Sequence, residues 1–270
     1  MGERSFALMY GTAWKELETE RLTAQALAAG FRAIDTANQR KHYHEAGVGH
    51  AVAASGLPRA SLFLQTKFTY ARGQDQRLPY DPKAPIATQV EQSFARSLEH
   101  LQTEYVDSYV LHGPWASGWS AQDREAWHAM EVLHANGQAR ALGVSNVSLA
   151  QLERLCAEAK RPPAFVQNRC YARHGWDRDV RSFASRHGIV YQGFSLLTAN
   201  RAELATRTVT DLARRLGATV PQVIFRFALA LGLLPLTGTS DRQHMQEDLA
   251  APTFALEKED VERIERIDGM

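Results

Sequence analysis

The sequence predicts a single α/β domain, a closed (β/α)8 TIM barrel with parallel strands. Three observations support this fold. Short apolar runs alternate with amphipathic segments, and eight such strand–helix pairs follow one another along the chain. No strand is followed by the GxGxxG fingerprint of open dinucleotide-binding sheets. The length of 270 residues suits one such barrel. We therefore expect one domain over residues 1–270.

The expected strands are short apolar runs bounded by glycine, proline or polar residues. The second strand, for example, is a buried run that ends on Asp35, where the chain must leave the sheet. In chain order the strands cover residues 6–10, 32–35, 61–67, 105–112, 139–146, 164–169, 188–197 and 233–239.

The expected helices have apolar residues at helical spacing, and capping residues mark some of their ends. Gly30 ends the first helix, and Ser148 can cap the fifth because its hydroxyl accepts from free N–H groups. The helices cover residues 16–29, 45–54, 86–101, 126–137, 148–160 and 177–187, stretches beginning at Thr208 and Val220, and a last one from Glu257.

Composition excludes several classes of partner. Hydrophobic residues make up 44% and charged residues 23%, as in ordinary globular proteins. The net charge is +1 without long runs of one sign, so neither nucleic acid nor a membrane surface is an expected partner. No apolar stretch is long enough for a span or a secretory signal, so we expect a cytoplasmic protein. Cys156 and Cys170 lack metal-ligand spacing and are expected in the core.

Polar side chains end most of the expected strands. Because the strands of a parallel barrel point the same way, these side chains would gather at its carboxyl face, where the loops converge on one mouth. Each alone has an ordinary structural explanation, such as a solvated lysine or a capping aspartate. Their coincidence at successive strand ends predicts a site. They are Asp35, Lys67, His112, Ser145, Asn146, Gln167, Phe194 and Ser195.

Tyr43, in the loop after Asp35, completes a set of groups that can transfer a proton. Tyrosine titrates near 10, and a lysine ammonium about 4 Å away favours the phenolate by roughly 4 kcal/mol, or about 3 pK units. Asp35 would hold Lys67 charged, and a neutral His112 would donate an N–H to a substrate oxygen. Such a set can protonate a carbonyl oxygen while hydride reaches the carbon.

Seven separated motifs give the chain a family resemblance over nearly its whole length. They are YGTAWK, GFRAIDTA, LQTK, YVDSYVLHGP, ALGVSN, VQN and GFSLL. In this order they resemble the aldo-keto reductase family, in particular bacterial members without a carboxyl-terminal closing loop. The resemblance implies a tetrad of Asp35, Tyr43, Lys67 and His112, an aldehyde or ketone substrate, and a nicotinamide cofactor, with NADP(H) favoured over NAD(H).

The resemblance also implies which residues bind the cofactor and the substrate. Ser145, Asn146 and Gln167 would hold the nicotinamide carboxamide, and Phe194 would stack on its ring. The other expected cofactor contacts are Gly11, Thr12, Ser195, Leu197, Gly238, Thr239, Ser240, His244 and Asp248. Trp14, Phe68 and Trp115 would line the substrate pocket, and Trp119 would add a further apolar wall.

Two positions depart from the family pattern. The usual tyrosine position falls on His42 when counted back from Glu45, because the loop is longer, and we assign the role to Tyr43. Gly238 stands where many members have a lysine that binds the 2′-phosphate. The phosphate could then be met by the hydroxyls of Thr239 and Ser240, by backbone N–H groups at the start of the next helix, or by Arg242 or His244.

The pocket is expected to be open, because the sequence stops soon after its last helix. We also expect a monomer, since the sequence has no heptad pattern and no long apolar edge.

Two other functions fit parts of the pattern. A cofactor-sensing barrel of weak or no activity could regulate a partner protein, although Lys67 and His112 argue against it. A metal-dependent hydrolase or isomerase could use His42, His44 and Asp35, but the two histidines lie in a loop. Metal is not required by the reductase interpretation.

Overall fold

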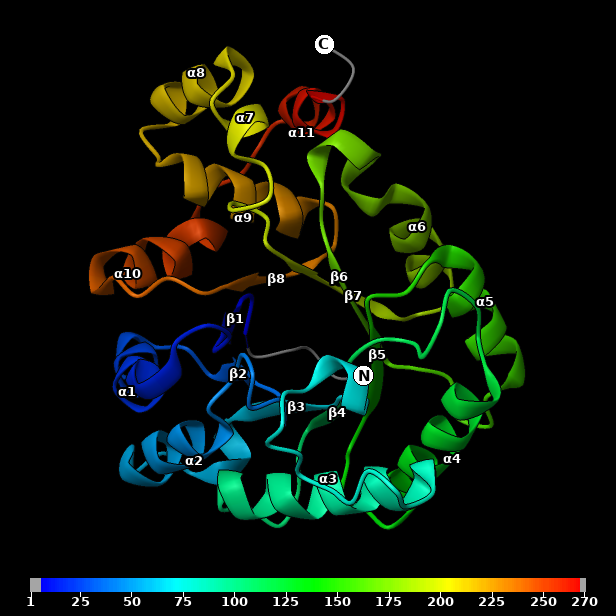
Figure 1. Ribbon diagram of the computed structural model, residues 1–270. Helices are drawn as coiled ribbons and strands as arrows, with labels where there is room; N and C mark the ends of the chain where they lie inside the picture. Colours follow the sequence, from blue (N-terminus) through cyan, green and yellow to red (C-terminus); the bar gives the residue numbers. More distant parts are fainter. Residues whose placement is uncertain (1–5, 268–270) are drawn as a thin grey trace.

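The computed structural model describes residues 6–267, and its centre is a closed barrel of eight parallel strands (Figure 1). Each strand pairs with its neighbours in sequence, and the last strand pairs with the first through Met9 and Leu236. The predicted fold class is therefore confirmed. The strands are β1 (Met9–Gly11), β2 (Ala33–Asp35), β3 (Phe63–Phe68), β4 (Ser108–Leu111), β5 (Leu142–Ser145), β6 (Phe165–Arg169), β7 (Val190–Phe194) and β8 (Leu234–Thr237).

Helices surround the barrel (Figure 1). Two of them, α8 and α11, pack on α9 and on each other. The α-helices are α1 (Thr19–Ala29), α2 (Glu45–Ala54), α3 (Ile86–Leu101), α4 (Ala121–Ala135), α5 (Leu149–Glu158), α6 (Arg178–Arg186), α7 (Arg201–Leu204), α8 (Arg207–Leu216), α9 (Val220–Ala230), α10 (Arg242–Ala250) and α11 (Lys258–Glu265). Short 3-10 turns are η1 (Glu16–Glu18), η2 (Arg59–Ser61), η3 (Ala71–Gly73), η4 (Ala172–Asp177) and η5 (Ala251–Thr253).

Side-chain capping fixes the starts of several helices. The Ser148 hydroxyl accepts from the Gln151 N–H, and the Gln151 side chain accepts from the Ser148 N–H, so the predicted cap is confirmed as a full capping box. Ser120 forms the same box with Asp123. This second box starts α4 at Ala121, five residues before the expected start at 126, because the apolar spacing becomes clear only after the first turn.

The first expected helix also begins differently. Its first turn is the 3-10 turn η1, and the α-helix starts at Thr19. Trp14 and Glu16 have φ values of 62° and 47°, in the left-handed region that side chains disfavour. The chain therefore leaves β1 through a sharp bend before α1 can form.

Alternation along the strands gives the barrel interior a layered composition. One buried cluster, inside the barrel, contains Met9, Ala33 and Leu234 with Phe63 packed against it. Since side chains two residues apart share a face, the strands that place Ala33 and Phe63 inside also place Asp35, Gln65 and Lys67 inside, nearer the carboxyl ends. The interior is thus apolar at one end and polar at the other. Intervening residues such as Ile34 and Leu64 face the helices and belong to the larger core.

The remaining expectations on composition can be compared with the structure directly. Cys170 is buried and Cys156 half-buried, and neither forms a disulfide. Within residues 6–267 no helix has the length and apolar character needed to cross a membrane.

Close packing of α2 on α3 leads to a stability prediction. A Cβ atom added at Gly49 would lie 1.9 Å from the backbone oxygen of His100, so one helix must move. Gly49→Ala should lower the free energy of unfolding by about 3 kcal/mol, the upper part of the usual range for overpacking. Urea unfolding measures this loss. Gly118→Ala is the control, since a Cβ there meets nothing within 4 Å; equal effects of the two changes would contradict the packing argument.

Candidate active site

A buried ion pair lies at the carboxyl ends of β2 and β3. Lys67 Nζ donates to Asp35 Oδ1 at 2.7 Å, to Asp35 Oδ2 at 2.8 Å and to the Thr36 carbonyl at 2.7 Å. These bonds use all three ammonium hydrogens. Lys67 has no exposed surface and Asp35 only 3%. Burial lowers the pKa of Lys67, while the Asp35 charge opposes that shift.

A layer of glutamine amides supports the carboxylate of this pair. Gln65 Nε2 donates to Asp35 Oδ1 at 2.7 Å, and Gln167 Nε2 donates to the same oxygen at 3.0 Å. Gln192 exchanges two hydrogen bonds with Gln65 and accepts a third from Gln167. Sequence reasoning missed Gln65 and Gln192. It expected the Gln167 amide to face a cofactor carboxamide, whereas both hydrogen bonds that Gln167 Nε2 donates lie within this layer.

Tyr43 lies beside the ion pair. Its ring centroid is 5.3 Å from Lys67 Nζ and 5.9 Å from the His112 ring centroid, which it meets edge-on. His42, the alternative for the tyrosine position, turns instead to Trp14, with 3.8 Å between ring centroids. The loop thus brings Tyr43, rather than His42, to Lys67 and His112.

The proton affinity of Tyr43 differs from the expectation. Burial, followed by the Asp35 charge, raises its pKa above the ordinary value of 10. The expected lowering by Lys67 does not appear, because Asp35 neutralises that charge and receives two of its three hydrogens. Tyr43 is therefore held in its protonated form, which can donate a proton.

His112 is neutral, and one of its ring nitrogens, Nδ1, contacts the Thr69 hydroxyl. Burial, assisted by the Lys67 charge, lowers its pKa well below 6.5. Its Nδ1 lies 2.6 Å from the Thr69 hydroxyl, and its backbone N–H donates to Phe68 O at 2.9 Å. A hydroxyl can donate to this nitrogen or accept from it. If Thr69 donates to Nδ1, the imidazole hydrogen is on Nε2, as a donor for a ligand.

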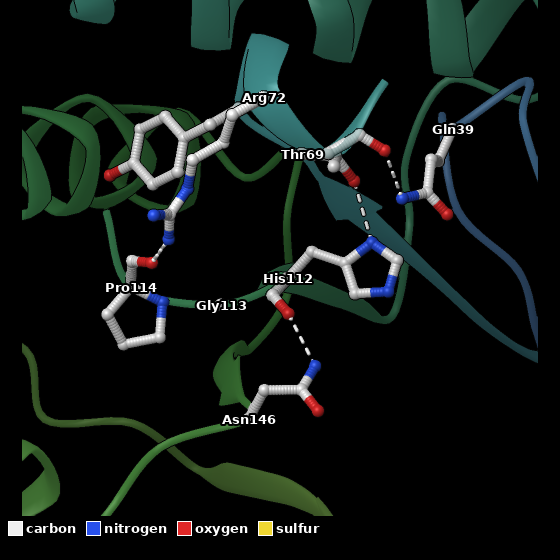
Figure 2. Close-up of a pocket in the computed structure, with 9 residues that line it drawn as sticks. Gln39, Thr69, Arg72, His112, Gly113, Pro114 and Asn146 are labelled. Carbon is white, nitrogen blue, oxygen red and sulfur yellow. Dashed lines mark hydrogen bonds between the residues drawn. The ribbon is translucent and has the colours of Figure 1, made fainter. Parts of the chain in front are cut away.

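A pocket of about 190 Å³ opens beside these groups. Figure 2 shows His112, Thr69 and Gln39 on one side of it, and Arg72 with Pro114 on the other. The residues that line it are Gln39, Thr69, Tyr70, Arg72, Gly73, His112, Gly113, Pro114 and Asn146.

The aromatic residues expected in this pocket are not among the residues that line it. Phe68 has no exposed surface and packs against Tyr70, because it alternates with the inward-facing Lys67. Trp119 is also buried. Trp14 is 71% exposed, and the ring centroid of Trp115 lies 5.8 Å from the Arg72 guanidinium.

The residues expected to contact the nicotinamide lie at the carboxyl ends of β5 and β7. Asn146, at a φ of 55°, donates through Nδ2 to His112 O at 2.7 Å and to Ser145 Oγ at 3.1 Å. Ser145 donates to Gln167 O at 2.7 Å. Phe194 is half-buried, and the Arg169 guanidinium lies 5.4 Å from its ring centroid. Ser195 follows it in the left-handed region, at a φ of 56°.

Lys15 is a cation that sequence reasoning missed. It lies at Gly238, where the adenosine end of the cofactor is expected. Its Nζ donates to the Gly238 carbonyl at 2.7 Å, so a lysine from the β1 loop reaches the position where the family lysine is absent. Lys15 is only 8% exposed, and burial lowers its pKa to about 8.

The start of α10 differs from the expectation of a free anion site. Asp241 Oδ1 accepts from the N–H groups of Gln243 at 2.7 Å and His244 at 3.0 Å, so a carboxylate already occupies the helix end. Just before this helix, Thr239 Oγ1 accepts from the Asp241 N–H, and Ser240 is exposed. Leu197, the expected cofactor contact after β7, is half-buried.

Asp248 and the β1 residues have structural partners. Asp248 is buried and accepts from the Thr237 hydroxyl at 2.7 Å. Burial raises its pKa to about 6. Thr12 donates its hydroxyl to Asp35 O at 2.9 Å, and a Cβ at Gly11 would lie 3.5 Å from Thr237 O.

The metal-site alternative requires three or more ligands in one place. Among residues 6–267 no group of three or more histidine, cysteine, aspartate or glutamate side chains could hold a metal ion. Asp35 is bound to Lys67, and His42 Nδ1 lies 2.9 Å from Gln39 Oε1.

An α/β barrel with a polar site at the carboxyl ends of its strands defines the class of protein. The profile of the aldo/keto reductase family matches residues 5–269, and the chain belongs to that family. An aldo-keto reductase of Mycolicibacterium paratuberculosis is 32% identical over 248 residues, 92% of this chain and 80% of that protein. A glyoxal reductase of Bacillus subtilis is 29% identical over 252 residues, 92% of this chain and 83% of that one.

A solved structure gives the same assignment. The crystal structure of an aldo/keto reductase from Brucella melitensis superposes with a TM-score of 0.83 at 28% identity. The match covers 97% of this chain and 94% of that one. The family resemblance inferred from the seven motifs is therefore confirmed.

The contact between Thr69 and His112 makes a spectroscopic prediction. In Thr69→Val the ring loses the donor at Nδ1, so the two neutral tautomers should mix, and the ¹⁵N shifts of the two ring nitrogens should converge. NMR of ¹⁵N-histidine-labelled protein measures this. Thr69→Ser keeps the hydroxyl and should preserve the wild-type shifts. Unchanged shifts in the valine variant would show that Thr69 does not set the tautomer.

The raised pKa of Asp248 makes a prediction about stability and pH. The pKa of the Asp248 carboxyl is 3.8 in the unfolded chain and about 6 in the folded one. The contribution of this group to the free energy of unfolding is therefore present at low pH and is lost as pH rises through this range. Asp248→Asn keeps an acceptor for the Thr237 hydroxyl, and because an amide does not titrate, it removes the loss of stability on raising the pH. Its advantage over wild type in unfolding free energy should grow by about 2 kcal/mol from pH 4 to pH 7.

Urea unfolding at both pH values measures this difference. Asp211→Asn is the control, because that carboxylate is 58% exposed on the surface of α8. Its difference from wild type should stay within about 0.5 kcal/mol. A constant advantage of Asp248→Asn at both pH values would contradict the linkage.

Proposed function

We propose that this protein reduces aldehydes or ketones to alcohols, using NADPH as the hydride donor and Tyr43 as the proton donor. Family membership supports carbonyl reduction, and the glyoxal reductase of Bacillus subtilis is a relative of that activity. The single observation that carries the proposal is the position of Tyr43. Its protonated ring lies against Lys67 and against the neutral His112, which lines the pocket.

The residues at the strand ends fit a nicotinamide. Phe194 offers a half-buried aromatic face, and the Asn146 side chain lies at the pocket and at the end of β5. When bound, the cofactor supplies hydride to the carbonyl carbon. Lys15 at Gly238 offers a positive charge where a 2′-phosphate would be bound, and this supports the preference for NADPH over NADH. Asp241, as an anion nearby, limits that preference.

The protein's own groups would then act on the substrate oxygen. With the Thr69 hydroxyl donating to Nδ1, the Nε2–H of His112 would hold the carbonyl oxygen in place. Tyr43 would donate its proton as negative charge develops on the oxygen. The Lys67 ammonium would stabilise the resulting phenolate, and Asp35 would keep Lys67 in position.

Two further proposals concern the state of the protein in the cell. A monomer is supported by the scarcity of large exposed apolar side chains, which in the described residues are Trp14, Leu17 and Val132. A cytoplasmic location is supported by two cysteines that form no disulfide, as is usual in a reducing compartment.

Replacing the proton donor tests the proposal. Tyr43→Phe should lower kcat for a small aldehyde such as methylglyoxal by about 10²- to 10⁴-fold, the range for loss of a general acid. NADPH consumption followed by absorbance measures this. Tryptophan fluorescence should show that NADPH still binds to the variant. It should also show that NADPH binds to the variant more tightly than NADH binds to wild type. Full activity in Tyr43→Phe would disprove the assignment.

Tyr105→Phe is the matched control. Tyr105 precedes β4, at the opposite end of the barrel from the site, and its ring contacts Arg59 and Arg140. The same loss of a hydroxyl there should leave kcat unchanged. If both variants lost activity equally, the effect would come from folding rather than from the proton.

A further inference from the structure

Arg72 is the one ionised side chain in the lining of the pocket. The other lining residues are neutral, since the pKa of His112 is well below its usual value. The nearby Lys67 charge is balanced by Asp35 within the same buried pair. The electrostatic character of the pocket is therefore set by a guanidinium.

The guanidinium is held in place but has no anionic partner. Arg72 donates through Nη2 to the Pro114 carbonyl, and its guanidinium lies 5.8 Å from the Trp115 ring centroid. In the part of the chain that the structure describes, no carboxylate lies within ion-pair distance of it. Arg77, in the same loop, differs in that it is paired with Asp75.

A guanidinium carries five N–H donors, and the Pro114 bond uses one of those on Arg72. The remaining donors suit the paired oxygens of a carboxylate or phosphate, which arginine binds with two parallel hydrogen bonds. Figure 2 shows Arg72 across the pocket from His112, where the proposed function places the carbonyl oxygen. A substrate with its carbonyl at His112 would therefore extend toward Arg72.

We propose that the pocket selects carbonyl compounds that carry an anionic group, a carboxylate or a phosphate, and that Arg72 binds this group. This inference rests on the proposed reductase function and names its substrate class. Because Arg72 is exposed, water also solvates it, so the selectivity is a preference and neutral carbonyl compounds are still reduced.

Matched substrates test the preference. Succinic semialdehyde and its methyl ester share the same four-carbon chain, and the ester replaces the charged carboxylate by a neutral methyl carboxylate group. The wild type should show a kcat/KM about tenfold higher for the acid than for the ester, mainly through KM. Arg72→Met removes the charge and keeps a similar length, and it should abolish this ratio while changing kcat/KM for the ester less than about threefold. High salt should lower the wild-type ratio.

Arg77→Met is the control for net charge, since it removes an arginine from the same loop without altering the pocket. It should keep the wild-type ratio. Glyceraldehyde 3-phosphate compared with glyceraldehyde distinguishes a phosphate from a carboxylate as the better ligand, and a preference for either anion supports the proposal.

Three results would overturn the inference, and they can be told apart. Equal kcat/KM for charged and neutral members of both pairs would remove the anion preference and leave carbonyl reduction intact. An equal loss for acid and ester in Arg72→Met would show that Arg72 acts on the loop rather than on the charge. Reduction of no carbonyl compound by wild type, with NADPH bound, would instead disprove the proposed function and this inference with it.

Discussion

The ion pair between Lys67 and Asp35 is the interaction on which the rest of the site depends. Two charges removed from water cost several kcal/mol each, and only good geometry and full hydrogen bonding compensate for that cost. Here the ammonium has three acceptors, and the carboxylate accepts from Lys67, Gln65 and Gln167. The polar layer inside the barrel thus serves a pair that could not be buried without it.

The balance of this pair also explains the state of Tyr43. A single ammonium at this distance would favour a phenolate, whereas a neutral pair exerts a much weaker field on the ring. Burial then dominates, and the pKa of Tyr43 rises. The ion pair becomes useful once negative charge forms, because its ammonium is already in place and need not reorganise. In the proposed reaction, the same arrangement would therefore keep the proton on Tyr43 beforehand and stabilise the phenolate that its loss leaves.

The sequence predicted the barrel and the grouping of the tetrad residues because both follow from local patterns. Strand ends in a parallel barrel meet at one face, so Asp35, Lys67 and His112 could be placed together without coordinates. Phe68 could have been placed as well, because a residue next to the inward-facing Lys67 must point outward. Its assignment to the pocket came from the resemblance and ignored the alternation along the strand.

Contacts between distant elements could not be predicted in this way. Thr69 and His112 end neighbouring strands, but the 2.6 Å contact depends on the register between β3 and β4. Lys15 reaches Gly238 across more than 200 positions of sequence, and the bend at Trp14 directs it there. Glutamines within a strand give no periodic signal of their own, so the layer around Gln192 became visible only when β3 was placed across the barrel interior from β6 and β7.

An even overall balance of charge concealed a local asymmetry at the carboxyl face. The net charge of +1 argues against polyanion partners, yet it does not describe the site. Lys15 lies at Gly238, after β8, and Arg72 lies in the pocket, after β3. Each is a cation without a carboxylate within ion-pair distance among the described residues, while Lys67 between them is neutralised. In the proposed reaction, these two cations would stand near a dinucleotide phosphate and an anionic carbonyl compound, and the neutralised Lys67 would stand beside the proton that Tyr43 donates.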